Sequence, residues 1–105
     1  MLFRSLGLRP KRVDVAVVLD DLNVRYRTDL RWRESVVDLM KLLGLDASRE
    51  NRYALADELG YFSQPGHSGK FIDNAEMNEW LRREIMKRVA ENGGEVPEEL
   101  RYENA

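Results

Sequence analysis

The segment 66–70, with the sequence Gly-His-Ser-Gly-Lys, is the part of this chain that comes nearest to a catalytic motif. A phosphate-binding loop would require Gly and then Ser or Thr where Gln64 and Phe71 stand, and it would have to follow a strand. A nucleophile elbow would require Gly at the position of Lys70. The segment is therefore interpreted as a flexible polar turn. No catalytic residue is predicted, and the chain is not expected to be an enzyme.

The sequence also contains few residues that could bind a metal ion or act as an acid–base pair. His67 is the single histidine and cysteine is absent, so a zinc site would have to combine one imidazole with Asp73 or Glu76. That ligand set falls short of a typical site, and neither a metal nor a cofactor is predicted. The acidic pairs at 20–21 and 98–99 are neighbours in sequence, but adjacent helix positions point in different directions. They are interpreted as solvated carboxylates.

Large apolar side chains gather between residues 61 and 72, beside a proline and two glycines. If exposed, such a patch would mark a partner or ligand surface. The alternative is that the rings fold back and close the gap between the third and fourth helices. Trp32 and Trp80 stand in phase with predicted core faces, so packing is preferred to ligand stacking for both. The predicted binding residues are Tyr61, Phe62, His67, Lys70 and Phe71, with Phe62 and Phe71 favoured as exposed contacts.

These residues must be positioned by helices, of which the most apolar is predicted at residues 32–44. Its apolar side chains repeat at i, i+3, i+4 and i+7 from Val36 to Leu43, and others widen that face. Gly44 is expected to end the helix because glycine adopts the left-handed conformation without steric cost. A helix apolar around most of its girth is expected to be the central, most buried element.

Periodicity and capping residues predict the remaining elements. The first of them alternates briefly as a strand would, but its helical spacing persists further, and Asp14 is a suitable N-cap. Asp46 or Ser48 caps the third helix, and Asp73 opens a capping box before the fourth. These helices cover residues 13–27, 46–59, 73–92 and 97–102. The predicted fold is all-α, a compact orthogonal arrangement of four main helices plus a short C-terminal helix within one domain, 13–102.

Composition restricts the partners. The 105 residues carry a net charge of −2, which argues against a nucleic-acid module built on a basic face. Residues 1–12, the basic arm, hold four basic and no acidic residues together with four leucine or phenylalanine side chains. Three interpretations of this arm are open: it contacts a membrane surface, it frays, or it packs its apolar side chains on the rest of the domain. Membrane anchoring is the least favoured of the three. No membrane span and no signal peptide are expected, and the absence of cysteine suits the cytoplasm.

A set of short motifs carries a resemblance to a known family. The motifs are Trp32-Arg33, Ser35, Val37 to Asp46, Leu59-Gly60-Tyr61, Met77-Asn78, Trp80-Leu81, Met86-Lys87, Ala90 to Gly94 and Val96-Pro97. Over residues 13–100 the chain resembles a family of small bacterial and viral domains of unknown function, number 3597. The resemblance implies a compact fold of five helices with a flexible loop after the first. It implies no activity, so it assigns no catalytic residue.

The function remains unknown at this level, and the preferred hypothesis is a non-enzymatic protein-interaction domain that uses the 61–72 loop surface. The alternative is a module that binds a small ligand or a cell-envelope polymer in a groove between this loop and the fourth helix. A protein partner would require a flat patch of several hundred Å². A ligand would require a concave pocket with convergent polar groups.

Overall fold

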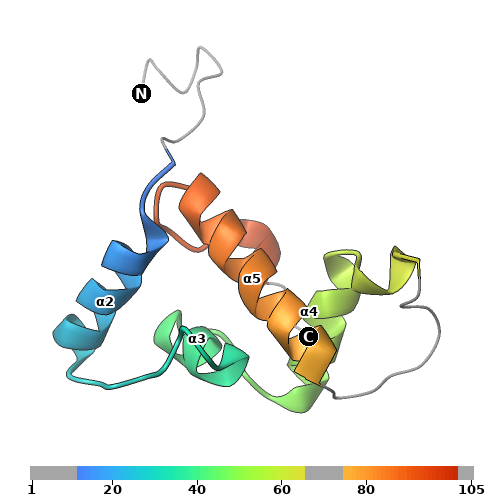
Figure 1. Cartoon of the computed structure of the whole chain (residues 1–105), viewed down its shortest axis with the longest axis horizontal. Coiled ribbons are helices and arrows are strands. Elements are labelled where there is room, and N and C mark those ends of the chain that lie inside the picture. The colour runs from blue at the N-terminus through green and yellow to red at the C-terminus, as the bar shows by residue number, and fades with distance from the viewer. Residues whose placement is uncertain (1–11, 66–74, 102–105) are drawn as a thin grey trace, which may run out of the picture.

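The computed structural model describes residues 12–65 and 75–101, which contain helices and no strand (Figure 1). The elements are α2 (Val15–Tyr26), α3 (Val36–Leu42), α4 (Arg49–Glu58), η1 (Tyr61–Ser63), α5 (Ala75–Glu91) and η2 (Glu98–Arg101), where η denotes a 3-10 helix. The all-α prediction is confirmed. The expected fifth helix is η2, a short 3-10 turn whose anchor Leu100 is fully buried. The basic arm up to residue 11 and the capping box at Asp73 lie outside the described residues.

Helix α5 lies in the centre of the molecule, between α2 and α4, with α3 beside it (Figure 1). It packs against all three of these helices through its face of Met77, Leu81, Ile85 and Val89. The predicted central helix, α3, has the highest share of buried residues, four of seven. Because α3 is only two turns long, the longer α5 is the element that connects the other helices.

Helix α2 forms as the helical period predicts, and the strand alternative is wrong. The backbone N–H of Ala16 donates to Oδ1 of Asp14 at 3.0 Å, which confirms the predicted N-cap. Leu19 is fully buried, while Val17 and Val24 on the opposite face are exposed. The helix therefore contributes one face to the core and presents apolar side chains on the other.

Helix α3 is shorter than predicted because Ser35 caps it. The Ser35 hydroxyl accepts a hydrogen bond from the Asp38 N–H at 3.1 Å, so the helix begins at Val36 rather than at Trp32. Its end is as predicted. Gly44 has a φ of 75°, and the N–H of the following residue, Leu45, donates to the carbonyl five positions back at 2.8 Å.

Helix α4 is capped by Ser48, one of the two predicted candidates, whose hydroxyl accepts from the Asn51 N–H at 3.2 Å. The other candidate, Asp46, accepts from the Ser48 N–H at 2.9 Å and so fixes the cap itself. After Gly60, with a φ of 97°, the chain makes the short 3-10 helix η1. The sequence predicted no helix in this loop; the turn ends before Pro65, which cannot donate an N–H.

Candidate functional site

The structure describes only the beginning of the predicted binding loop. Tyr61 is 4% exposed and belongs to the core, so it can support a binding surface only from beneath. Phe62 is half-buried and packs against the core. His67, Lys70 and Phe71 lie outside the described residues. Of the predicted binding residues that the structure describes, Phe62 is therefore the one that a partner could contact directly.

Four rings from three elements meet here, and we refer to them as the aromatic cluster. Tyr53 of α4 lies with its ring centroid 4.9 Å from that of Phe62, and Tyr61 lies 5.0 Å from Phe62 in an edge-to-face arrangement at 90°. Trp80 of α5 follows at 5.1 Å from Tyr61. These separations are those of favourable aromatic pairs. Tyr53, Phe62 and Trp80 are all half-buried, so each residue keeps some surface in solvent around the buried Tyr61.

Sequence reasoning did not include Tyr53 and Trp80 in the site. The helical phase of Trp80 predicts packing, and both residues do pack against the core. Helical phase identifies the inward face of one helix, but it does not show which side chains of different helices meet at the rim. Burial raises the pKa of the Tyr61 phenol, and the negative charge of Glu76 adds to that effect. Tyr61 therefore stays neutral through the physiological range.

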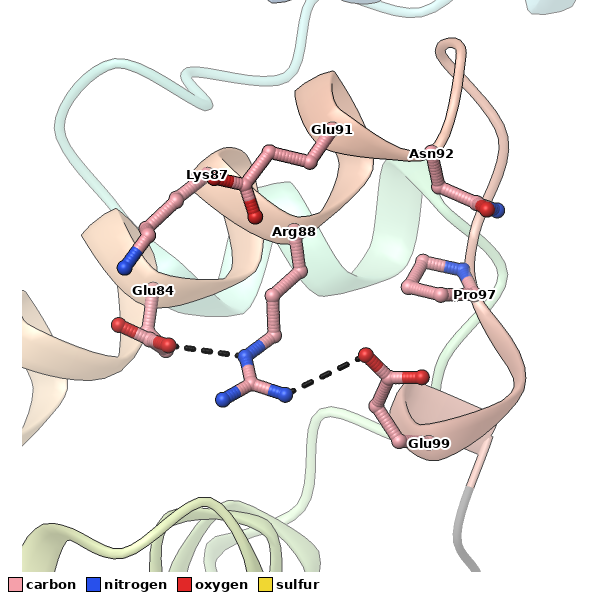
Figure 2. Close-up of a pocket in the computed structure, with 7 residues that line it drawn as sticks. All are labelled: Glu84, Lys87, Arg88, Glu91, Asn92, Pro97 and Glu99. Atoms are coloured by element: carbon pink, nitrogen blue, oxygen red, sulfur yellow. Dashed lines mark hydrogen bonds and ion pairs between the residues drawn. The ribbon is translucent and has the colours of Figure 1, made fainter. Parts of the chain in front are cut away.

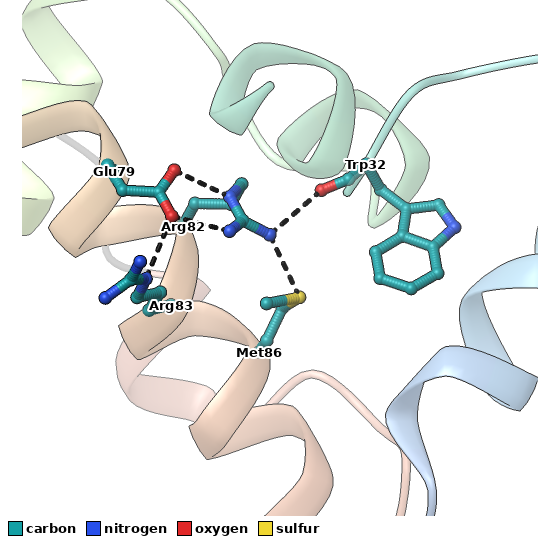
Figure 3. A network of polar contacts seen from close by, with 5 residues as sticks. All are labelled: Trp32, Glu79, Arg82, Arg83 and Met86. Atoms are coloured by element: carbon teal, nitrogen blue, oxygen red, sulfur yellow. Dashed lines mark hydrogen bonds and ion pairs between the residues drawn. The ribbon is translucent and has the colours of Figure 1, made fainter. Parts of the chain in front are cut away.

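A network of polar contacts joins α5 to the turn that precedes α3 (Figure 3). The Arg82 guanidinium is 12% exposed and donates to both Glu79 carboxylate oxygens, at 3.0 and 2.6 Å. Arg83 donates to the same carboxylate at 2.9 Å. A further Arg82 nitrogen lies 3.5 Å from the backbone carbonyl oxygen of Trp32 and 3.6 Å from the sulfur of Met86. The network links Arg82 to Trp32, 50 positions away in the sequence, and so holds α5 against the turn before α3. We refer to this network as the clamp.

We expect this clamp to make stability depend on pH. The hydrogen bonds from Arg82 are the main reason that the pKa of Glu79 is lowered from 4.5 to about 2. Burial opposes them, and the hydrogen bond from Arg83 and the positive charges of both arginines add to the lowering. A carboxylate with a depressed pKa stabilises the fold above pH 4.5, and that contribution is lost as the pH falls towards 2. Because the Glu79 side chain is 40% exposed, solvent screening reduces the effect to about 1 kcal/mol.

The variant Glu79→Gln tests this expectation. It should unfold about 1 kcal/mol more easily than the wild type at pH 7, and the difference should shrink between pH 4.5 and 2. Urea unfolding across this pH range measures it, with the exposed Glu58→Gln on α4 as control. A difference between wild type and Glu79→Gln that stays constant down to pH 2 would contradict the assignment.

A polar hollow of about 330 Å³ lies between the C-terminal half of α5 and η2 (Figure 2). Arg88 stands at its centre and donates to Glu84 at 2.8 Å and to Glu99 at 3.3 Å. The lining residues are Glu84, Lys87, Arg88, Glu91, Asn92, Pro97 and Glu99. Glu99 was predicted to be a solvated carboxylate; the structure places it in an ion pair with Arg88. The charges of the hollow thus largely satisfy one another.

Two further hollows border α3 and the turn before it. One, of about 370 Å³, lies between the start of α3 and the first turns of α5. The other, of about 250 Å³, is lined by the turn 29–34 and by Asp20 and Asn23 of α2. Here Arg33 donates to both Asp20 oxygens at 3.2 and 3.1 Å and lies 4.1 Å from the Trp32 ring centroid.

Asp20 is therefore paired rather than merely solvated. Its hydrogen bonds from Arg33 lower its pKa, and the bond from the Trp32 indole N–H, at 3.1 Å, acts in the same direction. The Trp32 ring itself is buried, which confirms its assignment to packing. Carboxylates with lowered pKa values are ionised at neutral pH, so they are poor general acids.

Within residues 12–65 and 75–101, no group of three His, Asp or Glu side chains is placed to hold a metal ion. The same ranges contain no helix that is both long and apolar enough to cross a membrane. The expectation of a zinc-free protein involves His67 and Asp73, which are not described, and it stays a prediction.

The fold and its polar contacts define a small all-helical domain with an aromatic cluster at one edge and paired charges elsewhere. A model of the family described as "Domain of unknown function (DUF3597)" matches residues 5–97, and the chain belongs to this family. Neither the curated proteins nor the solved structures contain a match to the chain. The family confirms the resemblance seen in the sequence, and the function of this protein is unknown.

Proposed function

We propose that this domain is a non-enzymatic protein-interaction module whose partner binds the 61–72 loop together with the aromatic cluster. The observation that carries the proposal is the meeting of Tyr53, Phe62 and Trp80 at one edge, each half-buried around the buried Tyr61. Tyrosine, tryptophan and phenylalanine are enriched at protein interfaces because they bury a large area for few rotatable bonds. A surface supported from beneath by Tyr61 is also held in a fixed shape, which reduces the entropy lost on binding.

The charged residues support a binding role over a catalytic one. Glu79, Glu84 and Glu99 each accept hydrogen bonds from an arginine, and the pKa of Glu79 is lowered rather than raised. A general acid at neutral pH requires the opposite shift. The net charge of −2 favours a protein partner over a nucleic acid, and a chain without cysteine suits a reducing cytoplasm in a bacterial cell.

The alternative, a small-ligand or envelope-polymer binder, places its groove between the loop and α5. None of the three hollows described above is lined by residues 61–65. In two of them the central charged groups, Arg88 and Asp20, are already paired. No specific observation on the described residues therefore favours this alternative over a protein partner.

Substitution of the loop phenylalanines tests the proposal. Phe62→Ala should destabilise the fold by about 1–2 kcal/mol, less than the 3–5 kcal/mol of a fully buried ring, because Phe62 is half-buried. Both Phe62→Ala and Phe71→Ala should weaken the complex about tenfold or more. The partner is first identified by affinity capture and cross-linking with the intact chain, and its dissociation constant is then measured by calorimetry.

The matched control is Val17→Ala, which also shortens an apolar side chain but lies on α2, on the other side of α5 from α4 (Figure 1). Its complex should be unchanged. Unchanged affinity in both phenylalanine variants, measured where they remain folded, would contradict the proposed surface.

A further inference from the structure

The outward face of α2 carries a second apolar surface that the proposed function does not use. Among the described residues, the large hydrophobic side chains that are exposed all belong to this helix: Val17 at 64%, Val24 at 77% and Tyr26 at 58%. Val17 and Val24 are seven positions apart, so they lie on one face two turns from each other. Asp20 and Asp21 stand between them at i+3 and i+4. We call Val17, Asp20, Asp21 and Val24 the outer stripe.

We propose that residues 1–11 of the same chain dock on this outer stripe. Residues 1–11 contain three basic residues and no acidic one, with Leu2, Phe3, Leu6 and Leu8 among them. Residues 13–24, which build most of α2, contain three acidic residues and no basic one. The two segments therefore match in both properties: each carries apolar side chains, and their charges are opposite.

Residues 1–11 are long enough to reach the outer stripe from the point where the chain is fixed. Arg12 pairs with Glu91 at 3.3 Å and the Val13 N–H donates to the Ala90 carbonyl at 3.1 Å, so the chain is fixed at the start of α2. Val24 lies about 14 Å further along the helix, while eleven extended residues span up to about 36 Å. The segment can reverse direction and still reach both valines. Because it is tethered beside the stripe, its effective concentration there is in the millimolar range.

The same charges argue against a second copy as the occupant. Two α2 helices that paired through their outer stripes would bring the carboxylates of Asp20 and Asp21 from both copies together, which is unfavourable. Arg25 and Arg33 pair with these carboxylates at the rim, with side chains 67% and 59% exposed. The single-contact pair of Arg25 with Asp21 contributes little free energy, so Asp21 remains able to interact with basic side chains of the arm. Asp20, which accepts two bonds from Arg33 and one from the Trp32 indole, adds its negative charge but is already paired.

Engineered cysteine pairs test the proposal directly, because the natural chain has no cysteine. The test protein is the full chain with Leu6→Cys and Val24→Cys, and the control combines Leu6→Cys with Glu58→Cys. Glu58 is also exposed but lies on α4, on the other side of α5 from α2 (Figure 1). In a glutathione redox buffer, the effective concentration of the Leu6–Val24 thiol pair should exceed that of the control pair by about tenfold or more.

A charge variant separates docking from mere proximity along the chain. Adding Asp21→Lys to the Leu6–Val24 pair should lower its effective concentration several-fold at low salt, and the loss should diminish at high salt. The same substitution in the control pair should have no such effect. Equal effective concentrations in the two pairs, or an insensitivity to Asp21→Lys, would overturn the proposal. Disulfide formation between chains in place of the internal bond would assign the stripe to a second copy and overturn it as well.

Discussion

Replacing Leu39 with Ala will lower the free energy of unfolding by about 2–5 kcal/mol. Leu39 is fully buried in α3, the helix with the highest share of buried residues, and it belongs to the single core cluster of the described residues. Truncation removes three carbon atoms and leaves a cavity that the surrounding helices can only partly fill. For a domain of this size the melting temperature should fall by roughly 8 °C or more.

Thermal unfolding followed by circular dichroism measures this effect, with Lys41→Ala as control. Lys41 lies in the same helix but is exposed, so its replacement removes no core contact and leaves helix propensity almost unchanged. A Leu39→Ala protein that melts at the wild-type temperature would show that α3 is not part of the core.

Replacing Arg52 with Met will cost about 2–4 kcal/mol of stability, for a reason that involves hydrogen bonds rather than volume. Arg52 is only 9% exposed; its Nε donates to the Ala47 carbonyl at 3.1 Å and its Nη1 to the Asn78 side chain at 2.8 Å. Methionine fills much of the space but leaves these two part-buried acceptors without their donor, at about 1–3 kcal/mol each. The bond to Asn78 also ties α4 to α5.

The matched control is Arg25→Met, because Arg25 forms an exposed ion pair with Asp21 on α2. This substitution should lower the free energy of unfolding by less than about 0.5 kcal/mol. Arg52→Lys should lie between the two, because a single ammonium cannot reproduce the fixed directions of the guanidinium donors. Chemical denaturation gives all three values. An Arg52→Met protein as stable as the wild type would contradict the assigned role.

The sequence determined the local features of this fold. Asp14 and Ser48 were recognisable as N-caps and Gly44 as a helix end, because a cap depends on side-chain and backbone atoms a few positions apart. The inward face of each helix also followed from spacing. Where local reasoning failed, as in the start of α3 at Val36, another local cap at Ser35 decided the boundary.

The tertiary structure alone decided which distant side chains meet. The indole of Trp32 donates to Asp20 from a separate segment, and Arg82 reaches the Trp32 carbonyl across 50 positions. Likewise, the ring of Phe62 has Tyr53 of α4 beside it because the chain turns at Gly60. Periodicity states which face of a helix is buried but not which neighbour it faces, since that depends on how helices pack against one another. The partners of each charge and ring are for this reason properties of the folded chain.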